Sequence, residues 1–159
     1  MKSILLIVAF TAIAFIHTSF AQDSAKPSRL FQLLTYYYQI KDALINGNSN
    51  TAALQAEEFL KTANGISNLT IPEGSRNALV KDASLISATK DISRQRSVFA
   101  NFSINMYALA KSLTLSAGPI YYDYCPMKNS YWLSSDKVIK NPYFGNAMLT
   151  CGSVKETLK

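Results

Sequence analysis

The sequence predicts a mainly α fold, an antiparallel bundle of four helices followed by a small, partly β cap at the C-terminal end. Apolar residues recur at three- and four-residue spacing between Leu30 and Leu113, which is the period of an amphipathic helix. Turn-forming residues at 46–50 and 64–65 divide this pattern into separate helices. After Ala117-Gly118-Pro119, aromatic and β-branched residues become frequent, which favours strands.

The pattern predicts an individual element for each segment between turns. We expect helices over 30–45, 51–63, 75–90 and 91–113, a single helical turn over 134–139, and two strands over 120–125 and 151–157. Asn50, Ser75 and Asp91 are the expected N-caps of the second, third and fourth helices. Helices three and four could also run together as one bent helix. Antiparallel pairing of the two strands would bring Cys125 and Cys151 together.

The fourth helix has the clearest apolar pattern. Its large apolar residues follow the spacing of a bundle seam, with one residue every three or four positions. They are Phe99, Phe102, Met106, Leu109 and Leu113. Met106 belongs to this seam, so it is expected to pack in the core rather than to bind a metal.

The first 21 residues have the features of a secretory signal peptide. Lys2 precedes an apolar run over residues 4–16, and Ser19-Phe20-Ala21 places small residues three before and one before a cut after Ala21. The run is shorter than the roughly 20 apolar residues of a membrane span. We therefore expect a periplasmic or secreted protein that meets the membrane only through its signal segment.

The rest of the chain is expected to be a flexible lead over 22–28 and a single domain over 29–159, with its cap at 117–159. The only histidine of the chain, His17, lies in the signal segment. Its removal excludes Ser/His/Asp catalysis and histidine-ligated metals, so we expect no enzyme activity. The chain carries a formal charge of +6 with scattered basic residues, and this argues against nucleic-acid binding.

The candidate functional residues are four sulfur-bearing side chains. Cys125 and Met127 form one cluster, and Met148 and Cys151 form the other. Thiolate and thioether sulfurs are soft donors that suit Cu(I). Three interpretations remain open: a soft-metal site of all four residues, a Cys125–Cys151 disulfide, and a redox switch between these states.

Five sequence motifs resemble a bacterial family of uncharacterised exported domains. In the C-terminal part these are Tyr124-Cys125-Pro126-Met127, Tyr131-Trp132-Leu133-Ser134 and Ile139-x-Asn141-Pro142-Tyr143-Phe144-Gly145-x-x-Met148-Leu149-x-Cys151-Gly152. The helical part contributes Tyr38-x-x-Lys41-Asp42-Ala43-Leu44 and Asp91-Ile92-x-x-Gln95-Arg96-x-x-Phe99. Such domains occur alone in Bacteroidetes-like bacteria and fused to periplasmic adaptors of copper and heavy-metal efflux pumps.

The resemblance implies a link to metal efflux. The Cys-Pro-Met opening is also similar to a small heavy-metal-binding domain of these pumps, in which a histidine follows the methionine. Lys128 stands at that place here, which leaves an all-sulfur site. The leading hypothesis is therefore a domain that binds or senses Cu(I).

The alternative is a structural or interaction module whose cap is locked by the disulfide. Its aromatic residues would then meet an efflux adaptor or another envelope protein. The expected interaction surface consists of Tyr121, Tyr131, Trp132 and Tyr143.

Overall fold

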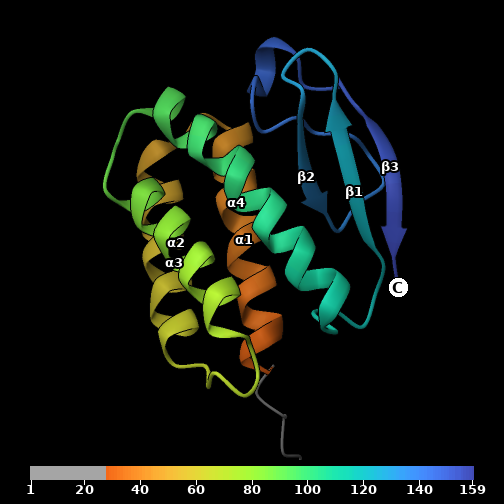
Figure 1. Cartoon of the computed structure of the whole chain (residues 1–159). Helices are drawn as coiled ribbons and strands as arrows, with labels where there is room; N and C mark the ends of the chain where they lie inside the picture. Colours follow the sequence, from red (N-terminus) through yellow and green to blue (C-terminus); the bar gives the residue numbers. More distant parts are fainter. Residues whose placement is uncertain (1–27) are drawn as a thin grey trace, which may run out of the picture.

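The computed structural model describes residues 28–159, and the expected signal peptide and nearly all of the expected lead lie outside this part. Four helices are followed by a three-stranded antiparallel sheet (Figure 1). The elements are α1 (Arg29–Ile45), α2 (Ser49–Asn64), α3 (Glu73–Ser87), α4 (Ile92–Ser112), β1 (Ile120–Cys125), β2 (Ser130–Ser134), the short 3-10 helix η1 (Gly145–Ala147) and β3 (Ser153–Leu158). The mainly α fold with a partly β C-terminal cap is confirmed.

Polar side chains start three of the helices. Ser28 accepts a hydrogen bond from the backbone N–H of Phe31, and Asp91 accepts from two amides of the first turn of α4. Asn48, rather than the expected Asn50, caps α2 by accepting from the Thr51 amide at 3.0 Å. The left-handed Gly47, with φ of 69°, makes the turn, and α2 starts at Ser49, two residues before the expected start.

The third helix differs most from its expected bounds. It begins at Glu73, with Pro72 at the N-cap position and without a side-chain cap hydrogen bond, so Ser75 lies inside the first turn rather than at the cap. It ends at Ser87, and α4 is a separate helix. The side-chain amide of Gln95 donates to the carbonyls of Ile86 and Thr89 and so satisfies acceptors at this junction.

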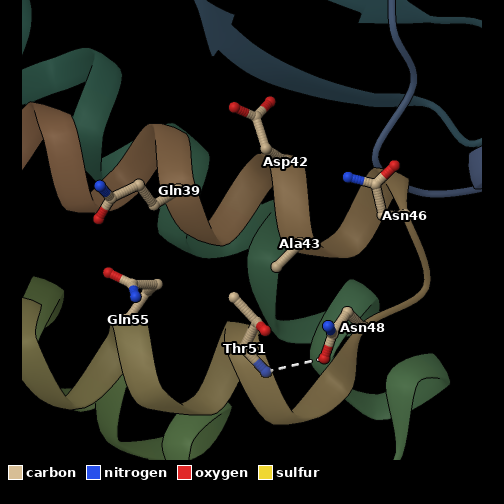
Figure 2. A pocket seen from close by; sticks show the side chains of 7 residues that line it. All are labelled: Gln39, Asp42, Ala43, Asn46, Asn48, Thr51 and Gln55. Atoms are coloured by element: carbon tan, nitrogen blue, oxygen red, sulfur yellow. Dashed lines mark hydrogen bonds between the residues drawn. The ribbon is translucent and has the colours of Figure 1, made fainter.

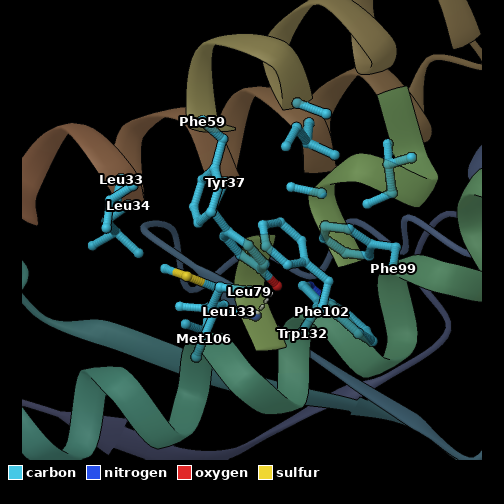
Figure 3. Packing of buried hydrophobic residues seen from close by; sticks show 14 of the residues in the cluster. Leu33, Leu34, Tyr37, Phe59, Leu79, Phe99, Phe102, Met106, Trp132 and Leu133 are labelled. Carbon is cyan, nitrogen blue, oxygen red and sulfur yellow. Dashed lines mark hydrogen bonds between the residues drawn. The ribbon is translucent and has the colours of Figure 1, made fainter. Parts of the chain in front are cut away.

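Each helix packs against the next one along the chain. Phe99, Phe102 and Met106 of the expected seam are fully buried. Tyr37 stacks on Phe99 with ring centroids 5.1 Å apart, and Phe59 meets Phe102 edge-on at 4.9 Å (Figure 3). Helices α1, α2 and α4 therefore share one aromatic core.

The sheet has the strand order β2-β1-β3, and β2 lies against α4. The expected pairing of β1 with a C-terminal strand is confirmed, with Tyr124 opposite Ser153. The second strand, β2, was not expected. The helical turn expected over 134–139 is wrong, because Ser134 ends β2 and no helix follows it in that stretch.

Tyr37 also connects the helices to the sheet. Its hydroxyl lies 2.7 Å from Ser103 Oγ on α4 and accepts a hydrogen bond from the backbone N–H of Leu133 on β2. The sheet is thus attached through a buried polar contact as well as by apolar packing. Over residues 28–159, no helix is long and apolar enough to cross a membrane.

Candidate soft-metal site

The cap brings Cys125 and Cys151 together, and we call these two residues the cysteine pair. Their Sγ atoms lie 3.1 Å apart and both thiols are free. Cys125 ends β1, while Cys151 lies two residues before β3. Because β1 and β3 pair antiparallel, the sheet holds the two sulfurs at the same end.

The distance between the two sulfurs lies between the values expected for two chemically distinct states. A disulfide has an S–S length of about 2.05 Å, and two thiolates on a tetrahedral ion lie roughly 3.8 Å apart if each metal–sulfur bond is about 2.3 Å. The observed 3.1 Å is about 1 Å or less from either value. Small side-chain movements can therefore reach both states.

The two thiols of the pair are not equivalent. Burial raises the pKa of the Cys125 thiol, but hydrogen bonds from Cys151, from the backbone of Lys128 and Met127 and from the Asn141 side chain lower it further than burial raises it. The pKa of Cys125 therefore lies below its usual value. The hydrogen bond to Cys125 is the main cause that raises the pKa of Cys151. Cys125 is the thiol that ionises first and is better suited to metal ligation.

Asn141 organises the loop around the pair. It is fully buried, and its side-chain Nδ2 donates to the Cys151 carbonyl at 2.8 Å. Its Oδ1 accepts from the Tyr143 amide at 2.8 Å, and its backbone N–H donates to the Leu149 carbonyl at 2.8 Å. The Asn-Pro motif was visible in the sequence as a turn, but its role in holding Cys151 was not.

The two methionines lie beside the pair along the chain. Met127 sits in the turn after β1 with 68% of its side chain exposed. Met148 is half-buried, and its carbonyl accepts from the Cys151 amide at 3.1 Å. Across residues 28–159, no three histidine, cysteine, aspartate or glutamate side chains gather as metal ligands. The thioether sulfurs of Met127 and Met148 are therefore the further soft donors nearest to the pair along the chain.

Two of the four aromatic residues expected at an interaction surface are buried. Trp132 is 0% exposed and Tyr143 is 4% exposed, so the prediction is wrong for them. Their rings meet edge-on at 6.0 Å, and the Tyr143 hydroxyl donates to the Tyr131 carbonyl. They fill the space between the sheet and the helices. Tyr121 and Tyr131 are half-buried and retain some exposed surface.

A buried charge lies two positions before Cys125. Asp123 is 0% exposed, and neither carboxylate oxygen has a hydrogen-bond partner among the described residues. Burial raises its pKa to about 6, and the positive charge of Lys41 opposes this shift. The strand alternation places Asp123 and Cys125 on one face. The alternation of this strand in the sequence contains that signal.

The structure also contains a groove between α1 and α2 (Figure 2). Its volume is about 300 Å³ and side-chain amides dominate its walls. The lining residues are Gln39, Asp42, Ala43, Asn46, Asn48, Thr51 and Gln55. None of them carries sulfur, so the groove has no part in soft-metal binding.

Fold and site together define a small, mainly helical domain whose sheet carries a paired-thiol site. The chain belongs to the family described as "Protein of unknown function (DUF3347)", whose model matches residues 33–118. The match spans the helices from within α1 and ends just before β1. The cysteine pair therefore lies beyond it. Neither a curated protein nor a solved structure matches this chain.

Proposed function

We propose that this protein is a non-enzymatic domain, periplasmic or secreted, that binds or senses a soft metal, Cu(I). The cysteine pair would supply two thiolates, and Met127 and Met148 the thioether ligands. The single observation that carries the proposal is the 3.1 Å separation of the Cys125 and Cys151 sulfurs. Two soft donors at this distance can share one soft cation with little movement.

The environment of Cys125 supports the proposal. Metal ligation requires a thiolate, and the backbone of Met127 and Lys128 helps to lower the pKa of the Cys125 thiol. The resemblance of the cap motifs to domains fused to efflux adaptors supports a role in metal efflux or homeostasis. Its partner would then be such an adaptor or another envelope protein.

We also propose that the four helices form the expected antiparallel bundle. The contacts between consecutive helices and the core shared by α1, α2 and α4 support it. In this arrangement the bundle serves as the scaffold that holds the sheet through Tyr37, and the sheet holds the sulfurs.

Competition for Cu(I) tests the metal hypothesis. Reduced protein is titrated under anaerobic conditions against a chelator of known Cu(I) affinity. Wild type is expected to take Cu(I) from the chelator, and a Cys125→Ser/Cys151→Ser variant is not. If both compete equally poorly, the proposal is wrong.

Methionine variants assign the remaining ligands. Met127→Leu and Met148→Leu conserve side-chain volume, so a loss of Cu(I) affinity in either variant reports a lost ligand. Met106→Leu is the matched control, because Met106 is fully buried in the helical core and its substitution should leave the affinity unchanged. An equal change in all three variants would instead indicate a general loss of structure.

A second candidate function is a structural or interaction module closed by a Cys125–Cys151 disulfide, without metal. The proximity of the two sulfurs supports it equally, and oxidising compartments favour pairing. The mass of intact protein taken from the envelope separates the two candidates. A mass about 2 Da below the reduced value, without bound metal, favours the disulfide. Reduced protein carrying copper excludes it.

A further inference from the structure

We propose that the cysteine pair is a thiol–disulfide exchange site with a fixed polarity. In its oxidised form, an incoming dithiol attacks Cys151 Sγ and displaces Cys125 as the leaving thiolate. Reduction by this route would open the pair for the soft metal. That last step rests on the proposed function, whereas the polarity of exchange does not.

Access to the two sulfurs is the first argument. Cys125 is 0% exposed at the end of β1, whereas Cys151 is only half-buried. Exchange proceeds by attack of a thiolate on one sulfur, and the sulfur that the attacker can reach takes the new bond. The fold therefore directs an external thiolate to Cys151.

The surroundings of the leaving sulfur are the second argument. The backbone of Lys128 and Met127 and the side chain of Asn141 lower the pKa of the Cys125 thiol, against the effect of its burial. These groups stabilise negative charge on a departing thiolate, and a stabilised leaving thiolate departs faster. The Met127 backbone also lowers the pKa of Cys151, but more groups lower the pKa of Cys125.

The exchange balances as two successive displacements. A partner thiolate bonds to Cys151 Sγ while the Cys125–Cys151 bond breaks and its electron pair goes to Cys125. The second thiol of the partner, after losing its proton, attacks the partner sulfur of the mixed disulfide and releases Cys151, which takes up a proton. The partner dithiol is oxidised to a disulfide, the cysteine pair is reduced by two electrons, and a disulfide oxidant reverses the process.

The test identifies the sulfur that is attacked. Oxidised full-length protein is mixed with excess glutathione, a monothiol, and stopped early with acid. The freed thiol is alkylated, and the mixture is digested with trypsin, which separates Cys125 from Cys151 by cutting after Lys128 and Lys140. We expect at least about tenfold more glutathione on Cys151 than on Cys125. Equal labelling, or an excess on Cys125, would overturn the proposal.

The same reaction in unfolding denaturant is the control. The preference should disappear there, because both sulfurs become accessible and the amides no longer surround Cys125. A preference that persists in denaturant would come from the local sequence rather than from the fold, and would also contradict the proposal.

Cu(I) competition by the oxidised and reduced proteins separates this inference from the proposed function. If reduced protein fails to bind Cu(I) but the attack falls on Cys151, the metal function is wrong and the exchange polarity stands. If oxidised and reduced proteins bind Cu(I) equally, the role of the exchange in opening the metal site is wrong.

Discussion

The hydroxyl of Tyr37 accepts a hydrogen bond from the backbone N–H of Leu133 at 2.9 Å, although the two residues are 96 positions apart in the sequence. Tyr37 lies in α1 and Leu133 in β2, and both are fully buried. A buried backbone N–H requires a partner, because water cannot replace it there. The side chain of Tyr37, a helical residue, thus supplies the acceptor for one backbone N–H of the sheet.

Replacing Tyr37 with phenylalanine should destabilise the protein by about 1–3 kcal/mol, because the Leu133 N–H loses its acceptor inside the core. The free energy of unfolding in urea measures this loss. Tyr36→Phe is the matched control: Tyr36 is the neighbouring, half-buried tyrosine, and its change should stay within roughly 0.5 kcal/mol. Equal losses in the two variants would contradict a special role for the Tyr37 hydroxyl.

Gly145→Ala should be much more damaging than Gly47→Ala. Both glycines have positive φ, 55° and 69°, which costs a non-glycine residue about 1–2 kcal/mol. At Gly145 a Cβ would also come within 2.7 Å of the Ile45 carbonyl oxygen and 2.6 Å of Arg96 Nη2, whereas at Gly47 nothing lies within 4 Å.

We therefore expect a loss of about 3 kcal/mol or more for Gly145→Ala, and only the backbone cost for Gly47→Ala. Chemical denaturation of both variants measures the difference. Similar losses would show that the loop containing Gly145 can move away from α1 and α4 without cost.

Asp123 should make stability depend on pH. Its pKa is raised from 3.8 to about 6 in the folded protein, so between these values the folded state binds more protons than the unfolded state. The contribution of Asp123 to the free energy of unfolding therefore falls as pH rises from about 4 to about 6, by up to about 3 kcal/mol, and stays level above this range.

Asp123→Asn removes this titration. Urea unfolding of wild type and variant between about pH 4 and about pH 7 should give a stability difference that shifts in favour of the variant as pH rises. Taking the difference between the two proteins cancels the other titrating groups. Parallel pH profiles would mean that Asp123 ionises as it does in the unfolded chain.

Oxidation of the cysteine pair should stabilise the fold. Its residues are 26 positions apart, and a cross-link over a loop of this length contributes roughly 3.5 kcal/mol in the chain-entropy model. Unfolding of wild type with and without reductant measures the gain. The Cys125→Ser/Cys151→Ser variant should show no response to reductant.

The helical part of the fold was predictable because local patterns determine it. The apolar period and the Asp91 cap gave α4 with its correct start, and the Asn-Gly turn after residue 45 ended α1. The strand β2 could not be recognised from its own pattern. Trp132, Leu133 and Ser134 are all buried, so β2 lacks the alternation of buried and exposed residues that marks a half-buried strand.

For the site, the sequence predicted the meeting of the cysteines but not their surroundings. Strand pairing determines the meeting, and alternation alone suggests that pairing. The burial of Trp132 and Tyr143 depends on how the sheet is placed against the helices, and no local pattern contains that information. Asn141 holds Cys151 through a hydrogen bond to its carbonyl. This contact depends on the path of the loop, which tertiary contacts determine.

The contact between Tyr37 and Leu133 also has a consequence for folding kinetics. Closing a long loop costs chain entropy before its contact can contribute, and the Tyr37–Leu133 contact spans 96 positions. The helices can form from contacts between neighbours, so we expect docking of the sheet to be the last folding step. Trp132, the only tryptophan of the chain, is buried in that sheet, and its fluorescence should report this step after the helical circular dichroism signal has developed.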